Sequence, residues 1–199
     1  QNTPNTVLFL GDHIYQYHLK EKKFSTITEE EGKDIVGTLV PFDHQENLTY
    51  INDIKHIYEL DDQTSRLKTV FECYTDTVIS SVSHDEQGHF WIGSNFGLIH
   101  YDPVLKSRTL VPTNLFTEIN MVLCDQKGKV WIGVDNMLFA YFIKEQKFVL
   151  FGESNGAIQN EYLPNARLVN EQGDAYIGGV KGMLRIDGQL LLNTSEMPE

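Results

Sequence analysis

The chain has 199 residues, of which 41% are hydrophobic and 22% are charged, which is ordinary for a globular protein and argues against disorder. Its formal net charge of -12 argues against a surface that neutralises nucleic-acid phosphates or docks on anionic lipid. No apolar run reaches the roughly 20 residues needed to cross a bilayer, so we expect this segment to contact neither nucleic acid nor membrane.

The N-terminal part of the chain predicts short strands rather than helices. Thr6 to Leu10 and Ile14 to Leu19 predict a hairpin, and a third strand is expected near Phe24 to Ile27. A further strand is expected over Ile35 to Pro41, where the proline ends it. Helical periodicity is absent from this region, so it favours a β structure.

The middle of the chain predicts a sheet of four strands most clearly. The expected strands are Ile79 to His84, Phe90 to Ser94, Leu98 to Tyr101 and Ser107 to Val111, with a polar turn over Asp85 to Gly88. The consecutive apolar residues from Phe90 to Ile92 would be unsuitable for a sheet with one face in water. They indicate a sheet that is covered on both faces.

This pattern recurs along the chain. The stretch Gly88 to Asp102, GHFWIGSNFGLIHYD, returns 40 positions later at Gly128 to Phe142, and again at Gly173 to Asp187. Weaker copies lie at Thr49 to Asp61 and Leu8 to His18. Repeats of roughly 40 to 45 residues with several short strands are typical of β-propeller blades.

The repeats therefore predict an all-β fold, a β-propeller made of about five four-stranded blades. The approximate units are 1–30, 31–75, 76–115, 116–159 and 160–193, within a single propeller segment over 1–199. We expect this segment to be an incomplete part of a larger propeller of the seven-blade type. The alternative is that five units close into a small ring by strand exchange between the ends.

The repeated tryptophans and glycines have structural interpretations. Trp91 and Trp131 are expected to pack between neighbouring blades rather than to bind a ligand. Gly93 and Gly133 indicate close approach of an adjacent unit, because a Cβ would occupy that space. The turn glycines Gly88, Gly128 and Gly173 are expected to have positive φ.

No motif for catalysis or cofactor binding is present. The sequence has no GxSxG, HExxH, phosphate-binding glycine loop or paired cysteine ligands, so we expect no catalytic residues and no cofactor. His84 and His89 flank one turn and could face each other, but two histidines without a third ligand do not predict a metal site. Whether Cys73 and Cys124 pair is left open, with unpaired thiols favoured.

Two stretches carry a resemblance to a known family. The units Ile79 to Tyr101 and Ile119 to Tyr141 resemble the two-component regulator propeller repeat. The last unit resembles the closing blade of the periplasmic sensor region of Bacteroides-type hybrid two-component system proteins. The matching positions there are Asn160, Glu161, Tyr162, Asn165, Ala166, Gly173, Tyr176, Ile177, Gly178, Gly179, Gly182 and Asp187.

The resemblance implies a non-catalytic sensor segment. It implies that this segment lies in the periplasm, as the extracytoplasmic part of an inner-membrane protein that carries a histidine kinase elsewhere. It also implies an oligosaccharide ligand and a homodimer of the intact protein. Two alternatives stay open, a propeller enzyme that acts on glycans as a lyase or hydrolase, and a protein-interaction scaffold.

Candidate ligand-binding residues come from the loops that gather on one face of a propeller. The loops between second and third strands offer Asn95, Phe96, Asp135, Asn136 and Lys181, and the connections between blades offer Asn160, Glu161, Tyr162 and Arg167. Amides, carboxylates and aromatic rings can hydrogen-bond sugar hydroxyls and stack on apolar sugar faces.

Overall fold

The computed structural model describes residues 6–10, 14–29, 40–45, 48–61, 64, 66–74, 76–115 and 117–189. These residues form strands and one short 3-10 turn, Glu153–Asn155, which confirms the all-β fold class. None of the described residues belongs to a helix long and apolar enough to cross a membrane. The chain divides into two compact units, Gln1–Asp76 and Thr77–Glu199.

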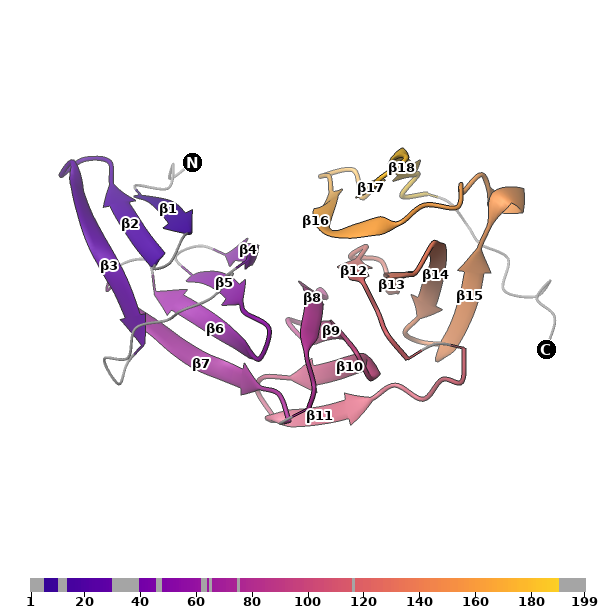
Figure 1. Ribbon diagram of the computed structural model, residues 1–199, viewed down its shortest axis with the longest axis horizontal. Coiled ribbons are helices and arrows are strands. Elements are labelled where there is room, and N and C mark those ends of the chain that lie inside the picture. Colours follow the sequence, from indigo (N-terminus) through magenta and orange to yellow (C-terminus); the bar gives the residue numbers. More distant parts are fainter. Residues whose placement is uncertain are drawn as a thin grey trace. The chain divides into compact units, whose positions relative to one another are not determined.

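The first unit contains one seven-stranded sheet with the order β1-β2-β3-β7-β6-β5-β4 (Figure 1). Its strands are β1 (Thr6–Leu10), β2 (Ile14–His18), β3 (Lys23–Glu29), β4 (Val40–Gln45), β5 (Leu48–Asn52), β6 (His56–Asp61) and β7 (Arg66–Glu72). The predicted hairpin and third strand are confirmed by β1, β2 and β3. Of the strand predicted over Ile35 to Pro41, residues 35–39 lie outside the described residues.

The second unit contains three separate antiparallel sheets. The first consists of β8 (Ile79–His84), β9 (Phe90–Ser94), β10 (Gly97–Asp102) and β11 (Ser107–Leu110). The second consists of β12 (Met121–Cys124), β13 (Lys129–Val134), β14 (Met137–Phe142) and β15 (Lys147–Phe151). The third consists of β16 (Tyr162–Val169), β17 (Ala175–Gly179) and β18 (Gly182–Ile186).

The prediction of separate four-stranded sheets needs one correction, in the first unit. In the first unit β3 and β7 pair in parallel, Thr28 with Arg66 and Glu29 with Leu67, so seven strands share one sheet. This pairing arises because β3 runs two residues beyond Ile27, where the sequence predicted its end. The last sheet has three strands among the described residues, and residues 190–193, after the last repeat, lie outside them. The first two sheets of the second unit have the predicted four strands.

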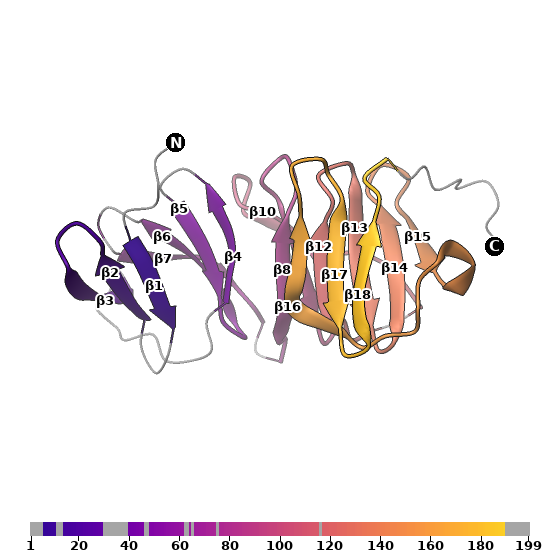
Figure 2. The same ribbon diagram turned by 90° about the horizontal axis from the view of Figure 1, so that it is seen from above.

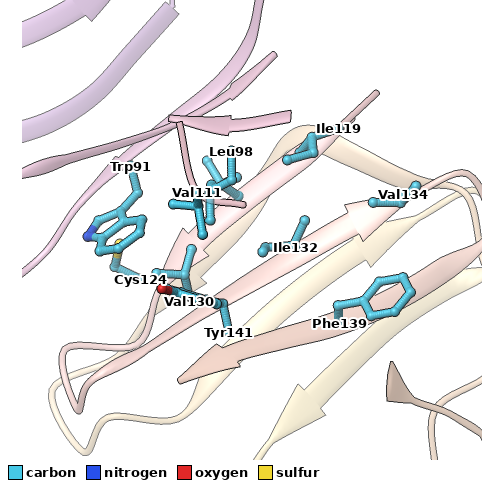
Figure 3. Packing of buried hydrophobic residues seen from close by; sticks show 11 residues of the cluster. Trp91, Leu98, Val111, Ile119, Cys124, Val130, Ile132, Val134, Phe139 and Tyr141 are labelled. Atoms are coloured by element: carbon cyan, nitrogen blue, oxygen red, sulfur yellow. The ribbon is translucent and has the colours of Figure 1, made fainter. Parts of the chain in front are cut away.

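The core of the second unit lies between its sheets. Figure 3 shows Trp91 and Leu98 of the first sheet, and Val111 directly after its last strand, facing Ile132 and its neighbours in the second sheet. Trp131 lies in the next layer, with residues of the second and third sheets. The Trp91 ring centroid is 5.6 Å from that of Tyr141 across the layer. The interpretation of both tryptophans as packing residues between sheets is therefore confirmed.

The repeated spacing of the strand glycines has the predicted steric cause. A Cβ at Gly93 would lie 2.7 Å from Ile119 Cγ2, and one at Gly133 would lie 2.9 Å from Tyr162 Cβ. Both are closer than real Cβ contacts, so only glycine lets the neighbouring sheet approach this far. The turn glycine Gly88 has the predicted positive φ of 80°, as do its equivalents in the other two sheets.

We expect Gly133→Ala to lower the free energy of unfolding by about 1–3 kcal/mol, because the added methyl group overpacks the layer. The Tyr162 and Met121 Cβ atoms, 2.9 and 3.3 Å away, are fixed to their backbones and cannot swing aside. Gly152→Ala is the matched control, since Gly152 has a φ of -111° and nothing within 4 Å of an added Cβ. Urea unfolding measures the difference, and equal stability of the two variants would contradict the steric argument.

Serine hydroxyls connect the innermost strands of the first two sheets. Ser81 Oγ accepts a hydrogen bond from Val122 N at 3.1 Å, and Ser83 Oγ accepts one from Cys124 N at 3.0 Å. The Ser80 hydroxyl donates to the Ile119 carbonyl. Because β12 is the edge strand of its sheet, these bonds satisfy backbone groups that have no partner strand.

The innermost strands β8, β12 and β16 contact one another within this unit (Figure 1). Arg167 on β16 bridges them, with its guanidinium donating to Ser81 Oγ and to the carbonyls of Val82 and Pro164. The serines and this arginine together hold three separate sheets around common inner strands.

Candidate functional site

The loops between second and third strands lie at one end of the second unit, together with the connections between sheets. In Figure 2 the strands of this unit run between two ends, so successive turns alternate between them. Ile119 N donates to Ser94 O at 3.0 Å, and Asn160 N donates to Asn136 O at 3.1 Å. Each connection is thus bonded to the loop of the preceding sheet. We call this end the loop face.

Asn160 is a buried residue of the loop face, with 1% of its surface exposed. Its Oδ1 accepts from Lys181 N at 2.9 Å, and its Nδ2 donates to the Gly182 carbonyl at 3.2 Å. A Cβ at Gly179 would lie 2.5 Å from this amide, so glycine leaves the space that it fills. Asn160 therefore shapes the β17–β18 loop, and a ligand would reach that loop rather than the amide itself.

Tyr162 is also buried, with 1% exposed surface, and packs against Gly133. Its hydroxyl donates to the Ile158 carbonyl at 3.0 Å. Burial raises the pKa of the Tyr162 phenol above its usual value. The ring belongs to the core between the second and third sheets, so it stabilises the loop face and is not available to a ligand.

Five exposed polar residues form the outer part of the loop face. We call Asp135, Asn136, Gln159, Glu161 and Lys181 the polar shelf. Asn136 Nδ2 lies 3.4 Å from Gln159 Oε1, and Glu161 O accepts from Val180 N at 3.1 Å. Asp135 has a φ of 49°, a left-handed conformation that aspartate tolerates in tight turns. The shelf therefore offers amide, carboxylate and ammonium groups to solvent.

Asn95 and Phe96 occupy the loop of the first sheet. Asn95 Oδ1 accepts from Val78 N at 2.8 Å, which fixes the segment that leads into β8. Phe96 has 53% of its surface exposed, and its backbone N–H donates to Ser94 Oγ at 3.2 Å. The Phe96 ring is thus an exposed aromatic surface on a loop that its own hydrogen bonds fix.

Arg167 lies apart from the loops, at the inner strands. It is half-buried, and burial of its guanidinium lowers the pKa to about 10. Its partners are a hydroxyl and two carbonyls of the inner strands, as described above. Of the nine candidate residues the structure therefore groups Asp135, Asn136, Asn160, Glu161 and Lys181 most closely.

The opposite end of this unit carries a groove that the sequence did not indicate. It has a volume of about 390 Å³ and is lined by Asp85, Glu86, Gln87, Cys124, Gln126, Lys127, Gly128, Lys129, Ile143 and Lys144. These residues come from tight turns of two neighbouring sheets, whose sequences read as ordinary polar turns. Cys124 is buried, and neither it nor Cys73 is in a disulfide.

Comparison with known proteins gives matches in structure only. No family model and no curated protein matches the sequence. The extracellular domain of the hybrid two-component system BT4673 of B. thetaiotaomicron superposes with a TM-score of 0.68, at 17% identity, over 94% of this chain and 25% of that chain. The corresponding domain of BT3049 gives 0.68, at 14% identity, over 94% and 26%. YCF48 bound to D1 peptide gives 0.69, at 12% identity, over 94% and 63%.

The chain has a β-propeller fold. Its resemblance to the extracellular domains of Bacteroides hybrid two-component systems is thereby confirmed for the architecture. The chain spans about a quarter of the length of those two domains. In this propeller the second unit supplies two four-stranded blades and three strands of another.

Proposed function

We propose that the chain is a non-catalytic ligand-recognition part of an extracytoplasmic sensor of the hybrid two-component type, and that its ligand is an oligosaccharide. The observation that carries the proposal is that the polar shelf and the exposed Phe96 ring lie on the same loop face. The architecture shared with BT4673 and BT3049 supports the sensor role. The intact protein would carry the histidine kinase, lie in the inner membrane and act as a homodimer.

The chemistry of the shelf suits sugars better than charged polymers. Asn136 and Gln159 both donate and accept hydrogen bonds, which matches the hydroxyl groups of a carbohydrate. Asp135 and Glu161 add two carboxylates and Lys181 adds one ammonium group, so the shelf has a formal excess of only one negative charge. An aromatic face such as that of Phe96 can cover the apolar side of a sugar ring.

Calorimetric titration with a panel of glycan oligosaccharides tests the proposal. We expect at least one glycan to bind, and Asn136→Ala or Lys181→Ala to weaken its binding about 3–10-fold, the value of one or two hydrogen bonds. Lys144→Ala, in the groove at the opposite end, is the matched control and should bind as the unchanged chain does. Absence of binding across the panel would remove the carbohydrate part of the proposal.

A protein-interaction scaffold is the second candidate. The propeller YCF48 is bound to a peptide in its solved structure, which shows that the fold can hold polypeptide. A protein partner rather than a glycan would then raise the melting temperature of the chain. The enzyme alternative predicts turnover of a glycan that is lost in Glu161→Gln, whereas the sensor proposal predicts binding without turnover.

A further inference from the structure

Two histidines and two aspartates gather at the end of the first four-stranded blade opposite the loop face. His89 Nδ1 lies 3.2 Å from His100 Nε2 and 3.6 Å from Asp85 Oδ2. The three ligand atoms, one from each of these residues, all lie within 4.8 Å of one another. Asp102 Oδ2 lies 3.6 Å from the other ring nitrogen of His89, Nε2.

The backbone brings these residues together from two different turns. The register of β8 and β9 pairs His84 with Phe90, so His84 and His89 are not cross-strand partners as the sequence suggested. The register of β9 and β10 instead pairs Trp91 with His100, which places His100 beside His89. The sequence separation of 11 residues between the two histidines concealed this contact.

The Asp85 carboxylate is held rigidly. Its Oδ1 accepts from Gln87 N and His89 N, each at 3.0 Å, and its Oδ2 accepts from Trp91 Nε1 at 2.8 Å. The Trp91 ring also packs on His100, with ring centroids 4.5 Å apart. A carboxylate oxygen has two lone pairs, so Oδ2 retains one after accepting the indole N–H.

In the other two blades the equivalent place holds a cationic side chain paired with a carboxylate. In the second blade Lys129 stands where His89 does, and its Nζ lies 2.8 Å from Asp125 Oδ2. In the third, Arg185 stands where His100 does, and it lies 2.7 Å from Oδ2 of Asp174, which stands where His89 does. The side chain beside the Asp85 carboxylate is instead the imidazole of His89, which can bind a metal. The first blade shares the turn aspartate of the second blade, Asp125, but has imidazole rings where the other two blades have Lys129 and Arg185.

We propose that this cluster is a zinc-type divalent metal site, with His89 Nδ1, His100 Nε2 and Asp85 Oδ2 as ligands. Two ligand atoms about 2.0–2.1 Å from a tetrahedral zinc ion are about 3.4 Å apart, close to the 3.2 and 3.6 Å observed here. Asp102 faces the second nitrogen of His89, as the carboxylates that orient metal-bound imidazoles do. Three protein ligands leave the fourth position for water or an external group.

The site is open to solvent on one side, and its carboxylates are mostly buried. The His89 side chain is 30% exposed, while the side chains of Asp85 and Asp102 are 7% and 14% exposed. An ion could therefore enter past His89 while both carboxylates stay fixed. Imidazole nitrogens and one carboxylate favour zinc and its transition-metal neighbours over calcium or magnesium, which prefer oxygen ligands alone.

Calorimetry with ZnCl2 on the chelator-treated chain tests the site. We expect one equivalent of Zn2+ to bind, His89→Gln and His100→Gln each to weaken binding more than tenfold, and Asp102→Asn to weaken it about 10–100-fold. His84→Ala is the matched control, because it lies on the same blade outside the cluster, and should bind as the unchanged chain does. Co2+ should give the intense visible absorption of a tetrahedral site in the unchanged chain and lose it in the double histidine variant.

Histidine-ring NMR provides a readout that needs no substitution. Titration with Zn2+ should shift the ring resonances of two histidines, His89 and His100, before any other. Binding of one equivalent that persists in the double variant, shifts confined to other histidines, or absence of Zn2+ binding by the unchanged chain would each overturn the proposal. None of these outcomes depends on the glycan experiment, which concerns the opposite end of the blades.

Discussion

Replacing Trp131 with alanine is expected to lower the free energy of unfolding by about 3–5 kcal/mol, as for other buried tryptophans. Trp131 has 1% of its surface exposed and fills the layer between the second and third blades. Its ring lies edge-on to Phe151, with centroids 5.2 Å apart. Alanine would remove this contact and leave a cavity. The surrounding strands are hydrogen-bonded within their sheets, so they cannot move in to fill it. Denaturant unfolding followed by circular dichroism measures the loss.

Replacing each of the two tryptophans with phenylalanine gives a matched comparison of their hydrogen bonds. Trp91 Nε1 donates to Asp85, whereas Trp131 Nε1 is buried and has no hydrogen-bond partner among the described residues. Lys129 explains the difference, because its ammonium takes the Asp125 oxygen that would correspond to the acceptor of Trp91. We expect Trp91→Phe to cost about 1–3 kcal/mol more than Trp131→Phe, since only the former leaves a carboxylate without its donor. A larger cost for Trp131→Phe would contradict this account.

Asn160→Ala is expected to lower the free energy of unfolding by about 1–3 kcal/mol. The substitution removes the side-chain hydrogen bonds to Lys181 N and the Gly182 carbonyl, and each such bond contributes about 0.5–1.5 kcal/mol. The effect should be on stability first, because the amide is covered by the loop that it shapes. Thermal and urea unfolding of the variant measure it.

Asn136→Ala is the control for Asn160→Ala, since both are asparagines of the loop face. Asn136 is exposed, and its side chain makes one long contact of 3.4 Å to another exposed side chain. We expect its removal to change stability by less than about 0.5 kcal/mol. If the two variants were equally stable, the structural role assigned to Asn160 would be wrong.

The parts of the fold predicted from sequence are those that repeat. The tryptophan at Trp91 and the glycine at Gly93 recur at fixed spacing because each blade meets its neighbour at the same place, and the structure confirms both roles. Strand bounds such as Phe90–Ser94 agree because the turns that flank them carry their own glycine signals. The parallel pairing of β3 with β7 was missed because it involves two residue pairs and has no sequence signal.

The candidate sites were harder to predict because a linear sequence does not show which side of a strand or loop faces solvent. Asn160 and Tyr162 occupy a connection between blades, yet both are buried. Exposed polar residues beside them, such as Gln159, went unnoticed because polar residues are common in loops. The contact of His89 with His100 depends on strand register, which periodicity alone does not fix.

The serine hydroxyls on β8 have a consequence for self-association. An unpaired strand edge is a template on which another chain can add a strand and begin to polymerise. Ser81 and Ser83 occupy the N–H groups of Val122 and Cys124 with short side chains, which cannot extend into a further ladder. The edge of β12 is thereby protected, because these two N–H groups are no longer free to pair with an added strand.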